Sequence, residues 1–305
     1  MKSLWLREKL SHIGVGMRLS NRLSLLVGAL VLALGLVFYF YFRQNFWVFG
    51  GGLTAPEERE ETAHFYKNPK VNIGNIVLKV FYVVPKNLKD RADPGLETVI
   101  RNTLDRAVQF HELQFRGLSN LKYYIFPEPV ILKEDNRFYD TVNTSKGNPE
   151  GLLRISQEIN DRVFVEGGDL YKERFAKVGE REYPVMGLIY EGVGAAGSAI
   201  YESELNSAAE IARQLGIPES EVRIVNIKGI EGFFIVSREY LTKPEYSLNG
   251  ATTLYHEFGH TMGLPDNYDT ETNQPLRMDI MGRGREEPLE LMYLDRSLLK
   301  DLGVL

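Results

Sequence analysis

The stretch HEFGHTMGLPD, residues 256–266, decides how the chain is expected to fold around a chemical site. Its first five residues form the pattern H-E-x-x-H, with two histidines four positions apart. On an α-helix this spacing places both imidazoles on one face, where they can hold a single metal ion. The pattern predicts a helix over about residues 251–262, with His256 and His260 as metal ligands.

The residues after this helix extend the pattern. Gly263 permits a sharp left-handed exit from the helix, and Asp266 follows three positions later. A chain that turns back in this way carries Asp266 toward the metal, so Asp266 is expected to be the third ligand. A carboxylate is expected because the remaining histidines are His12, His64 and His111, which lie far upstream. The alternatives for the third ligand are Glu286, Glu287 and Glu290.

The expected chemistry follows from these residue types. Neutral imidazoles suit zinc, and three protein ligands leave a fourth position for a water whose pKa falls to about 7. Glu257 lies beside the histidines, and we expect it to take the proton of that water and pass it to a leaving amine. The chain contains no cysteine, which excludes thiolate ligands and a cysteine nucleophile.

Residues 279–282, Asp-Ile-Met-Gly, follow the zinc pattern in the way that a methionine turn does. This position predicts that Met281 lies beneath the metal as a structural residue, although a methionine in a protein core is the simpler alternative. For Asp266 and Asp269 the alternative is a turn with local backbone hydrogen bonds, or a small calcium loop that also includes Asn267.

Three segments together, HEFGHTMGLPDNYDT, MDIMGRG and LELMYLDRSLLKDLG, resemble the immune inhibitor A type of secreted bacterial metallopeptidase over about residues 251–303. The resemblance implies a metzincin-like catalytic domain and zinc-dependent cleavage of proteins, and it allows for bound calcium. We find no match to that family between residues 43 and 250. The tyrosine that follows the methionine in several metzincin groups is missing, which leaves Tyr268 and Tyr293 as candidates for stabilising the oxyanion.

Upstream, apolar and β-branched runs alternate with helical spacing. The runs predict strands at 76–84, 122–126, 185–190, 222–227 and 233–236. Helices are predicted at 94–118, 152–163, 207–215 and, after the site, 289–302. The fold class is therefore predicted to be α+β, with a mixed twisted sheet and an active-site helix.

Two further motifs have competing interpretations. Residues 192–197 fit G-x-G-x-x-G, but a dinucleotide site should lead directly into a helix, whereas residues 198–201 have the pattern of extended chain. We interpret this motif as a glycine-rich bend beside the cleft. Arg283 and Arg285 either line the substrate cleft or keep a loop soluble.

The N-terminal part contains an uncharged run at residues 23–42, long enough to span a bilayer. Five basic residues precede it (Lys2, Arg7, Lys9, Arg18, Arg22), against Glu8 alone. The positive-inside rule then predicts a cytoplasmic segment 1–22, a transmembrane helix 23–42, a linker 43–74 and an extracytoplasmic metallopeptidase domain 75–305, in a bacterial cell membrane. The alternative is a cleaved signal peptide.

The composition of the 305 residues, 44% hydrophobic and 25% charged, is that of a globular protein. Of the 36 basic and 41 acidic residues, 31 and 40 remain after the expected cytoplasmic segment is subtracted, and this net charge of about −9 argues against a nucleic-acid partner. The leading hypothesis is a membrane-anchored zinc endopeptidase that attacks protein or peptide bonds with zinc-bound water. The alternatives are a catalytically silent ectodomain that binds a partner, and a zinc hydrolase of cell-wall peptides. A purely structural zinc site would not require Glu257.

Overall fold

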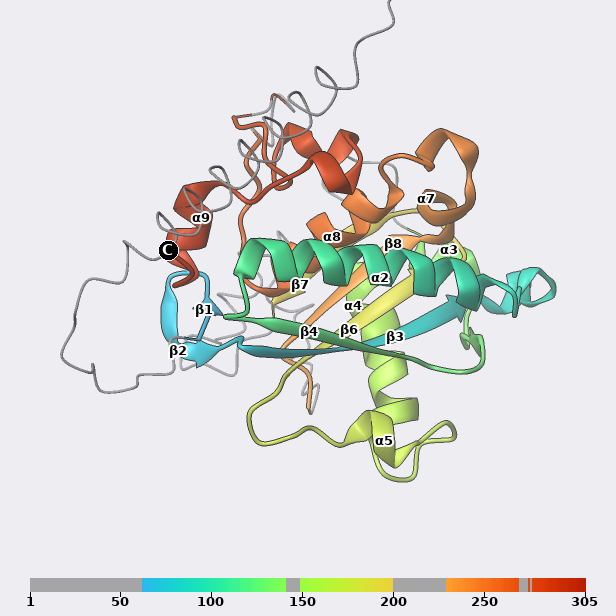
Figure 1. Cartoon of the computed structure of the whole chain (residues 1–305). Coiled ribbons are helices and arrows are strands. Elements are labelled where there is room, and N and C mark those ends of the chain that lie inside the picture. Colours follow the sequence, from blue (N-terminus) through green and yellow to red (C-terminus); the bar gives the residue numbers. More distant parts are fainter. Residues whose placement is uncertain (1–61, 141–148, 200–228, 269–273, 275) are drawn as a thin grey trace, which may run out of the picture. The chain divides into compact units, whose positions relative to one another are not determined.

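The computed structural model describes residues 62–140, 149–199, 229–268, 274 and 276–305 (Figure 1). The chain divides into two compact units, Met1–Arg59 and Glu60–Leu305, and the second contains all described residues. The strand predicted at 222–227 and the helix predicted at 207–215 lie outside the described residues, as do segment 1–22 and the run 23–42. The predicted domain boundaries stay predictions.

Strands and helices alternate along the described part of the chain. The strands are β1 (His64–Phe65), β2 (Asn68–Asn72), β3 (Asn75–Val84), β4 (Asn120–Ile125), β5 (Val130–Ile131), β6 (Tyr183–Tyr190), β7 (Ala195–Ala199) and β8 (Gly232–Ser237). The α-helices are α2 (Leu96–Phe115), α3 (Asn136–Tyr139), α4 (Pro149–Ile159), α5 (Glu173–Ala176), α7 (Arg238–Thr242), α8 (Gly250–Thr261) and α9 (Arg296–Asp301). The predicted α+β class with a mixed sheet is confirmed.

The central sheet has the order β4-β3-β6-β8-β7, and β5 continues it beside β3. Strands β4, β3, β6 and β8 are parallel, whereas β7 runs antiparallel to β8 with Gly197 opposite Phe234. The inner strands β3 and β6 are almost continuously apolar because both of their faces are buried. Among the described strands of this sheet, only β7, at its edge, runs in the opposite direction.

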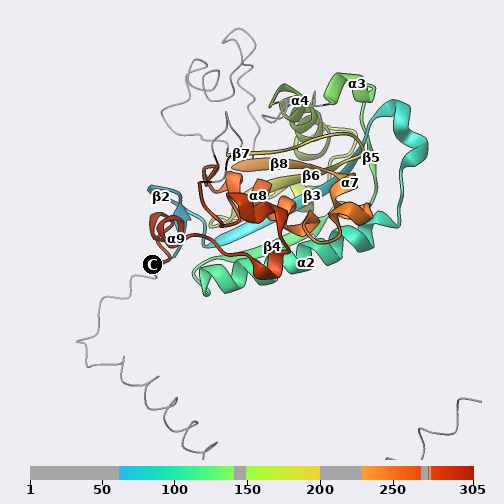
Figure 2. The same ribbon diagram turned by 90° about the horizontal axis from the view of Figure 1, so that it is seen from above.

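Two cores lie on opposite faces of this sheet. Leu78 and Val80 of β3 pack with residues of α2 and α8, and the intervening Phe81 and Val83 pack with residues of α4 and α5. This alternation follows from the two-residue period of a strand. Figure 2 shows the sheet between α2 and α8 on one side and α3 and α4 on the other.

A chain of buried hydrogen bonds joins α2 to α8. The Ser119 hydroxyl donates to the carbonyl of Ile73 at 2.5 Å, so it accepts from His111 Nε2 at 2.9 Å. His111 Nδ1 is then the acceptor for the Tyr255 hydroxyl, also at 2.9 Å. Each donor therefore meets one acceptor, and burial lowers the pKa of His111 to about 3.

The N-terminal transmembrane helix of the predicted fold class requires a correction. In the part of the chain that the structure describes, no helix combines the length and the apolar character that crossing a bilayer demands. The longest described helix, α2, has 20 residues, but five of them are charged: Glu97, Arg101, Asp105, Arg106 and Glu112. The run 23–42 lies outside the described residues, and the predicted contact with a lipid bilayer has no support. Localisation stays a prediction.

The helix predicted at 289–302 is shorter in the structure. A 3₁₀ turn covers Leu289–Leu291, and α9 begins only at Arg296, where the side chain of Asp295 accepts from Ser297 N. The backbone between them is used elsewhere: the Tyr293 carbonyl accepts from Ile280 N, and Leu294 N donates to Gln114. These contacts with two other elements outweigh the local helical pattern. Within the predicted linker, β1 and β2 form a paired hairpin.

Candidate metal centre

Helix α8 positions the paired histidines. Its apolar side chains, Leu254 and Phe258 among them, are buried in the core against the sheet, as the helical spacing predicts. The hydroxyl of Tyr183 on β6 donates to the carbonyl of Thr261 at 2.6 Å, which fixes the end of the helix. Gly263 then has φ of +82°, and a Cβ there would lie 2.2 Å from the Phe65 ring. The predicted left-handed exit is therefore present, and it turns the chain back toward the helix.

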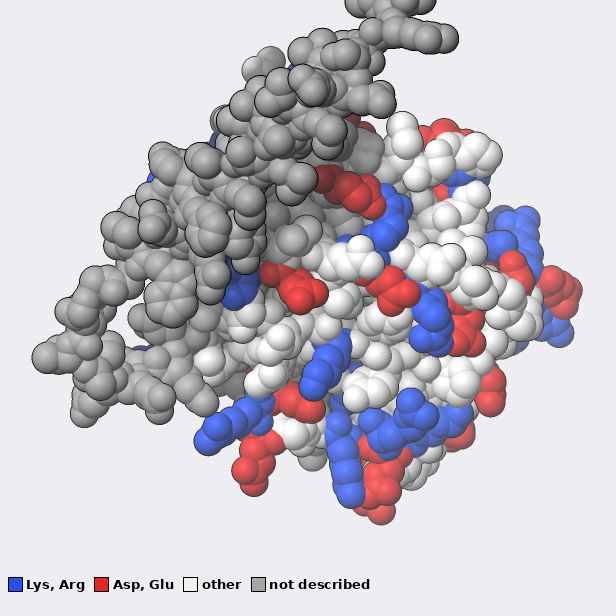
Figure 3. Space-filling view, in the orientation of Figure 1, with Lys and Arg blue, Asp and Glu red and all other residues white. Residues whose placement is uncertain are grey.

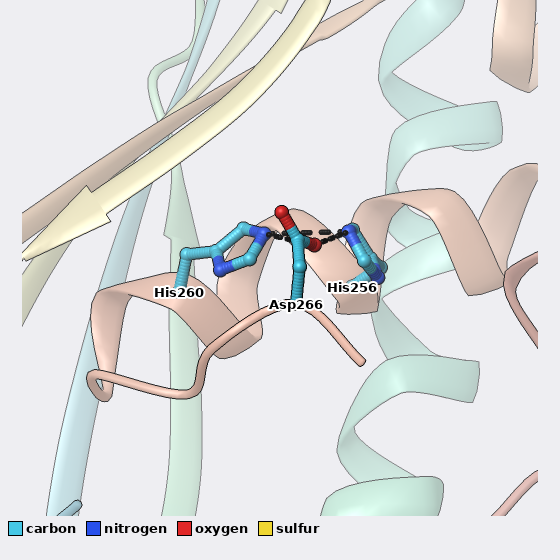
Figure 4. Close-up of side chains that lie close together, drawn as sticks. All are labelled: His256, His260 and Asp266. Carbon is cyan, nitrogen blue, oxygen red and sulfur yellow. Dashed lines mark hydrogen bonds and ion pairs between the residues drawn. The ribbon is translucent and has the colours of Figure 1, made fainter. Parts of the chain in front are cut away.

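The turn brings Asp266 to the two histidines (Figure 4). Asp266 Oδ1 lies 3.3 Å from His256 Nε2 and 3.4 Å from His260 Nε2, and the two Nε2 atoms are 3.3 Å apart. Among the described residues, these three form the group of side chains suited to holding a metal ion. The geometry brings together all three residues expected from the sequence.

The hydrogen bonds of the histidines decide which atoms face the centre. His256 Nδ1 donates to the Ile280 carbonyl at 2.9 Å, and His260 Nδ1 donates to the Leu264 carbonyl at 2.8 Å. In neutral imidazoles this leaves both Nε2 lone pairs directed at Asp266. The buried Asp266 Oδ1 has no hydrogen-bond donor. When both imidazoles are neutral, three acceptors therefore converge without a donor between them, and a metal cation fits this arrangement.

The pKa values reflect the same crowding of acceptors. Burial lowers the pKa of His260, but hydrogen bonding to Asp266 and the charge of Glu257 outweigh it and raise the pKa to about 9. Burial raises the pKa of Asp266, yet the two histidines hold it below its ordinary range. The centre thus requires positive charge, which a proton or a metal cation can supply.

Glu257 follows His256 on α8 and is buried. Its side chain is only 9% exposed, and burial raises the pKa of its carboxyl above the usual value. Its neighbours His256 and His260 oppose that rise. A buried carboxylate beside a cation is a group that can accept and return a proton.

The segment around Met281 packs against helix α8 between the two histidines. Met281 is fully buried, and its Sδ lies 2.8 Å from the position that a Cβ would take on Gly259, between the two histidines in sequence. Asn267 N donates to the Met281 carbonyl at 2.8 Å, and the Asn267 side chain donates to Asp279 at 2.8 Å. The loop that carries Asp266 is therefore clamped to the turn that carries Met281.

The alternative third ligands lie elsewhere. Glu290 forms a two-pronged pair with Arg106 of α2, and Glu286 and Glu287 are exposed. The two candidate tyrosines also separate. Tyr293 is 45% exposed, whereas the Tyr268 ring stacks on His256 with centroids 6.3 Å apart and an interplanar angle of 20°. Burial, with Asp266 nearby, raises the pKa of Tyr268 to about 12.

Two features of the site were not assigned from the sequence. The guanidinium of Arg285 lies over the Tyr268 ring, with its Cζ 4.3 Å from the centroid. The G-x-G-x-x-G segment begins with the predicted bend at residues 191–193, but its second half is the start of the edge strand β7, and a Cβ on Gly197 would stand 2.0 Å from the Glu257 carbonyl oxygen. The absence of a side chain at Gly197 is thus what lets β7 lie directly on α8, a reason that spacing alone does not reveal.

A helix with paired histidines, a converging carboxylate and an adjacent glutamate is the arrangement of a metallopeptidase. The comparison with protein families agrees: residues 192–282 match the family model described as the immune inhibitor A peptidase M6 catalytic domain. The match runs from the loop before β7 to the end of the methionine segment. It confirms the resemblance predicted from the sequence, and the matched segment is similar to that of a metallopeptidase. The match begins at residue 192, within residues 43–250 where no match was expected, and it ends at residue 282 rather than near residue 303. None of the curated proteins matches the chain.

Proposed function

We propose that the chain is a zinc endopeptidase that hydrolyses peptide bonds in proteins or peptides. The observation that carries this proposal is the convergence of His256 Nε2, His260 Nε2 and Asp266 Oδ1, which are all acceptors when the imidazoles are neutral. Glu257 stands next to that convergence on the same helix. The family match supports the reaction class.

The spacing of the ligand atoms favours zinc. Protein nitrogen and oxygen ligands lie about 2.0–2.1 Å from zinc, so two ligands at tetrahedral positions lie about 3.3–3.4 Å apart. The three separations in the centre are 3.3, 3.4 and 3.3 Å. Calcium prefers six to eight oxygen ligands at longer distances, which two imidazoles do not provide. The residues His256, His260 and Asp266 therefore fit zinc, and they are the residues that would hold it.

The residues of the chain then have distinct roles. A zinc ion bound there would supply a Lewis acid that lowers the pKa of water and polarises a carbonyl. Glu257 accepts a proton from the attacking water and delivers it to the leaving amine. The Tyr268 ring stacks on His256, which makes its hydroxyl the candidate for stabilising the oxyanion. The carbonyls of Ile280 and Leu264 keep both imidazoles in the tautomer that presents Nε2.

Strand β7 supports an extended peptide as the substrate. Within the described residues β7 pairs with β8 along one edge only, and it lies directly on α8 at Glu257. A peptide that adds to the other edge would bring its backbone past the metal centre. This geometry favours cleavage within a chain rather than recognition of a folded surface.

The test is hydrolysis of an unfolded protein by the full chain. We expect cleavage by the wild type, none after treatment with a chelator, and recovery when zinc is returned. Glu257→Ala should bind zinc and remain folded but lose cleavage. A Glu257→Ala variant that cleaves as fast as the wild type would refute the assignment of the base. A folded, zinc-loaded wild type without any activity would favour the silent ectodomain.

A further inference from the structure

The short strand β1 lies between the ends of two helices (Figure 1). Its residue Phe65 covers Gly263, where the chain leaves α8, and its residue His64 covers Gly303, where the chain leaves α9. Both glycines are left-handed, with φ of +82° and +73°. A Cβ on Gly263 would lie 2.2 Å from the Phe65 ring, and a Cβ on Gly303 would lie 2.6 Å from the His64 ring. Strand β1 is thus fitted closely against both turns.

Backbone hydrogen bonds hold β1 in this place. Tyr66 N donates to the Met262 carbonyl at 3.1 Å, and His64 N donates to the Leu302 carbonyl at 2.9 Å. Phe65, between these two donors, is only 4% exposed and belongs to the core that contains α2 and α8. Its ring therefore cannot move away from α8 without the loss of backbone hydrogen bonds and of buried apolar contact.

The turn beneath the Phe65 ring leads to the third residue of the metal centre. Gly263 N donates to the His260 carbonyl at 3.0 Å, and Leu264 N donates to the Gly259 carbonyl at 3.3 Å. The Leu264 carbonyl then accepts from His260 Nδ1 at 2.8 Å. Asp266 follows two positions later. The position of this turn thus sets both the orientation of one imidazole and the approach of the carboxylate.

A glycine turn needs support from another segment. Gly263 has no side chain that could anchor it, and glycine has more conformational freedom than any other residue. Its positive φ also excludes most side chains, so a larger residue at this position would not provide the missing packing. The Phe65 ring provides it from a distant part of the sequence. The segment that matches the peptidase family, residues 192–282, does not include β1.

We propose that Phe65 is a positioning residue for the metal centre: its ring holds the Gly263 turn so that Asp266 stays within reach of the two histidines. This inference rests on the proposed zinc site. It gives a role to a strand that precedes β3 and that lies in the segment predicted to be a linker. Loss of the ring should weaken zinc binding although every ligand remains, because the residues that orient ligands contribute to metal affinity.

The experiment measures the Kd of zinc for the full chain, by competition with a chromogenic chelator that starts from metal-free protein. Phe65→Leu keeps an apolar side chain but removes the ring, and we expect it to raise the Kd by about tenfold or more. Phe126→Leu is the matched control, because Phe126 is 3% exposed in the core on the opposite face of the sheet. It should lower the urea midpoint by a similar amount and leave the Kd unchanged. An unchanged Kd in Phe65→Leu overturns the inference.

A double-mutant cycle tests the contact between the ring and the turn. Gly263→Ala places a Cβ against the Phe65 ring, so it should raise the Kd of zinc strongly. In the Phe65→Ala background the same substitution meets no ring, and it should raise the Kd by a smaller factor. Equal factors in the two backgrounds would show that the ring does not act through this turn, which overturns the inference.

Hydrogen exchange of the metal-free protein separates this inference from the proposed function, because it requires neither zinc nor cleavage. The amides of Gly263 and Leu264 report on the turn directly. We expect both to exchange about tenfold faster in Phe65→Leu than in the wild type, and at the wild-type rate in Phe126→Leu. Unchanged exchange at these two amides overturns the inference and leaves the peptidase function intact. Faster exchange in a chain that cleaves no peptide would support the inference and count against the peptidase function alone.

Discussion

His111 lies on one side of helix α8 and the pair His256 and His260 on another, and the two sides differ in how their hydrogen bonds are completed. On the side facing α2, His111 lies between Tyr255 and Ser119, and every donor meets an acceptor. On the side facing the Asp266 loop, His256 and His260 bind carbonyls through Nδ1 and direct bare Nε2 atoms toward a carboxylate. Tyr255 and His256 are consecutive residues, yet one completes a structural network and the other opens a metal site.

Burial alone therefore does not decide the role of a histidine. His111 is the more deeply buried group, and its neutral form satisfies all its partners. The pair on α8 becomes satisfied only when a cation arrives. We therefore expect substitutions at His111 to affect folding, and substitutions at the pair to affect metal binding and catalysis.

The sharpest contrast is between His256→Ala and His111→Ala. We expect His256→Ala to reduce kcat/KM by two or more orders of magnitude, because a metal ligand is lost. The metal-free variant should lose less stability than His111→Ala, because only the hydrogen bond to the Ile280 carbonyl is broken. His111→Ala should lower the free energy of unfolding by about 3–5 kcal/mol, because it removes a buried ring and strands two hydroxyls. Denaturation curves and peptide hydrolysis check both. Equal losses of stability in the two variants would contradict the comparison.

Zinc should stabilise the folded protein only through the side of α8 that carries His256 and His260. A ligand at about one hundred times its Kd raises the free energy of unfolding by about 2.7 kcal/mol, provided that it binds only the folded state. We expect a gain of this size for the wild type and for Tyr255→Phe, but not for Asp266→Ala. Thermal unfolding at several zinc concentrations measures it. A full zinc response in Asp266→Ala would point to a different third ligand.

Acid should lower the stability of the protein through His111. The pKa of His111 is lowered by burial to about 3, below its unfolded value, so the unfolded chain binds more protons between those values and stability falls as the pH falls. Between pH 7 and pH 5 the loss from this one group is about 2 kcal/mol, and above pH 7 it vanishes. His111→Gln should remove that part of the pH dependence. Urea titrations at both pH values give the change in the free energy of unfolding between pH 7 and pH 5 for each protein. An identical change in wild type and His111→Gln would refute this assignment.

The smallest effect expected is that of a single hydroxyl. Tyr255→Phe leaves His111 Nδ1 without a donor in the core, which should lower the free energy of unfolding by about 1–3 kcal/mol. Tyr124→Phe is the matched control, because Tyr124 is 44% exposed, and it should change stability by less than about 0.5 kcal/mol. Activity per folded molecule should stay unchanged in both variants. A loss of zinc binding in Tyr255→Phe would show that the His111 network and the metal site are not independent.

The parts that could be predicted from the sequence are those set by short-range periodicity. The four-residue spacing of the histidines, the left-handed glycine and the apolar inner strands each have one strongly preferred local structure. Their elements appear where the sequence predicts them. Asp266 could be predicted as a ligand for the same reason, because only a short turn separates it from the helix.

The parts that could not be predicted depend on contacts between distant segments. His111 and Tyr255 are 144 positions apart, and no local pattern connects them. The backbone at 292–295 has helical composition but is drawn out by partners on α2 and the Met281 segment. Arg285 and Tyr268 belong to different loops, so their stacking follows from the fold of both. The space-filling view in Figure 3 illustrates a related limit: charges of both signs are interspersed over the visible face, and composition does not locate them.

The contact between β7 and α8 also bears on mutational tolerance. A Cβ at position 197 would overlap the backbone of the helix rather than the movable end of a side chain, so the strand itself would have to shift. Even alanine would therefore push the edge strand away from Glu257. In a saturation library, position 197 should accept glycine alone when the screen is for hydrolysis, whereas the neighbouring alanine positions tolerate more. Attempts to redesign the substrate preference would have to begin from β7 residues other than this one.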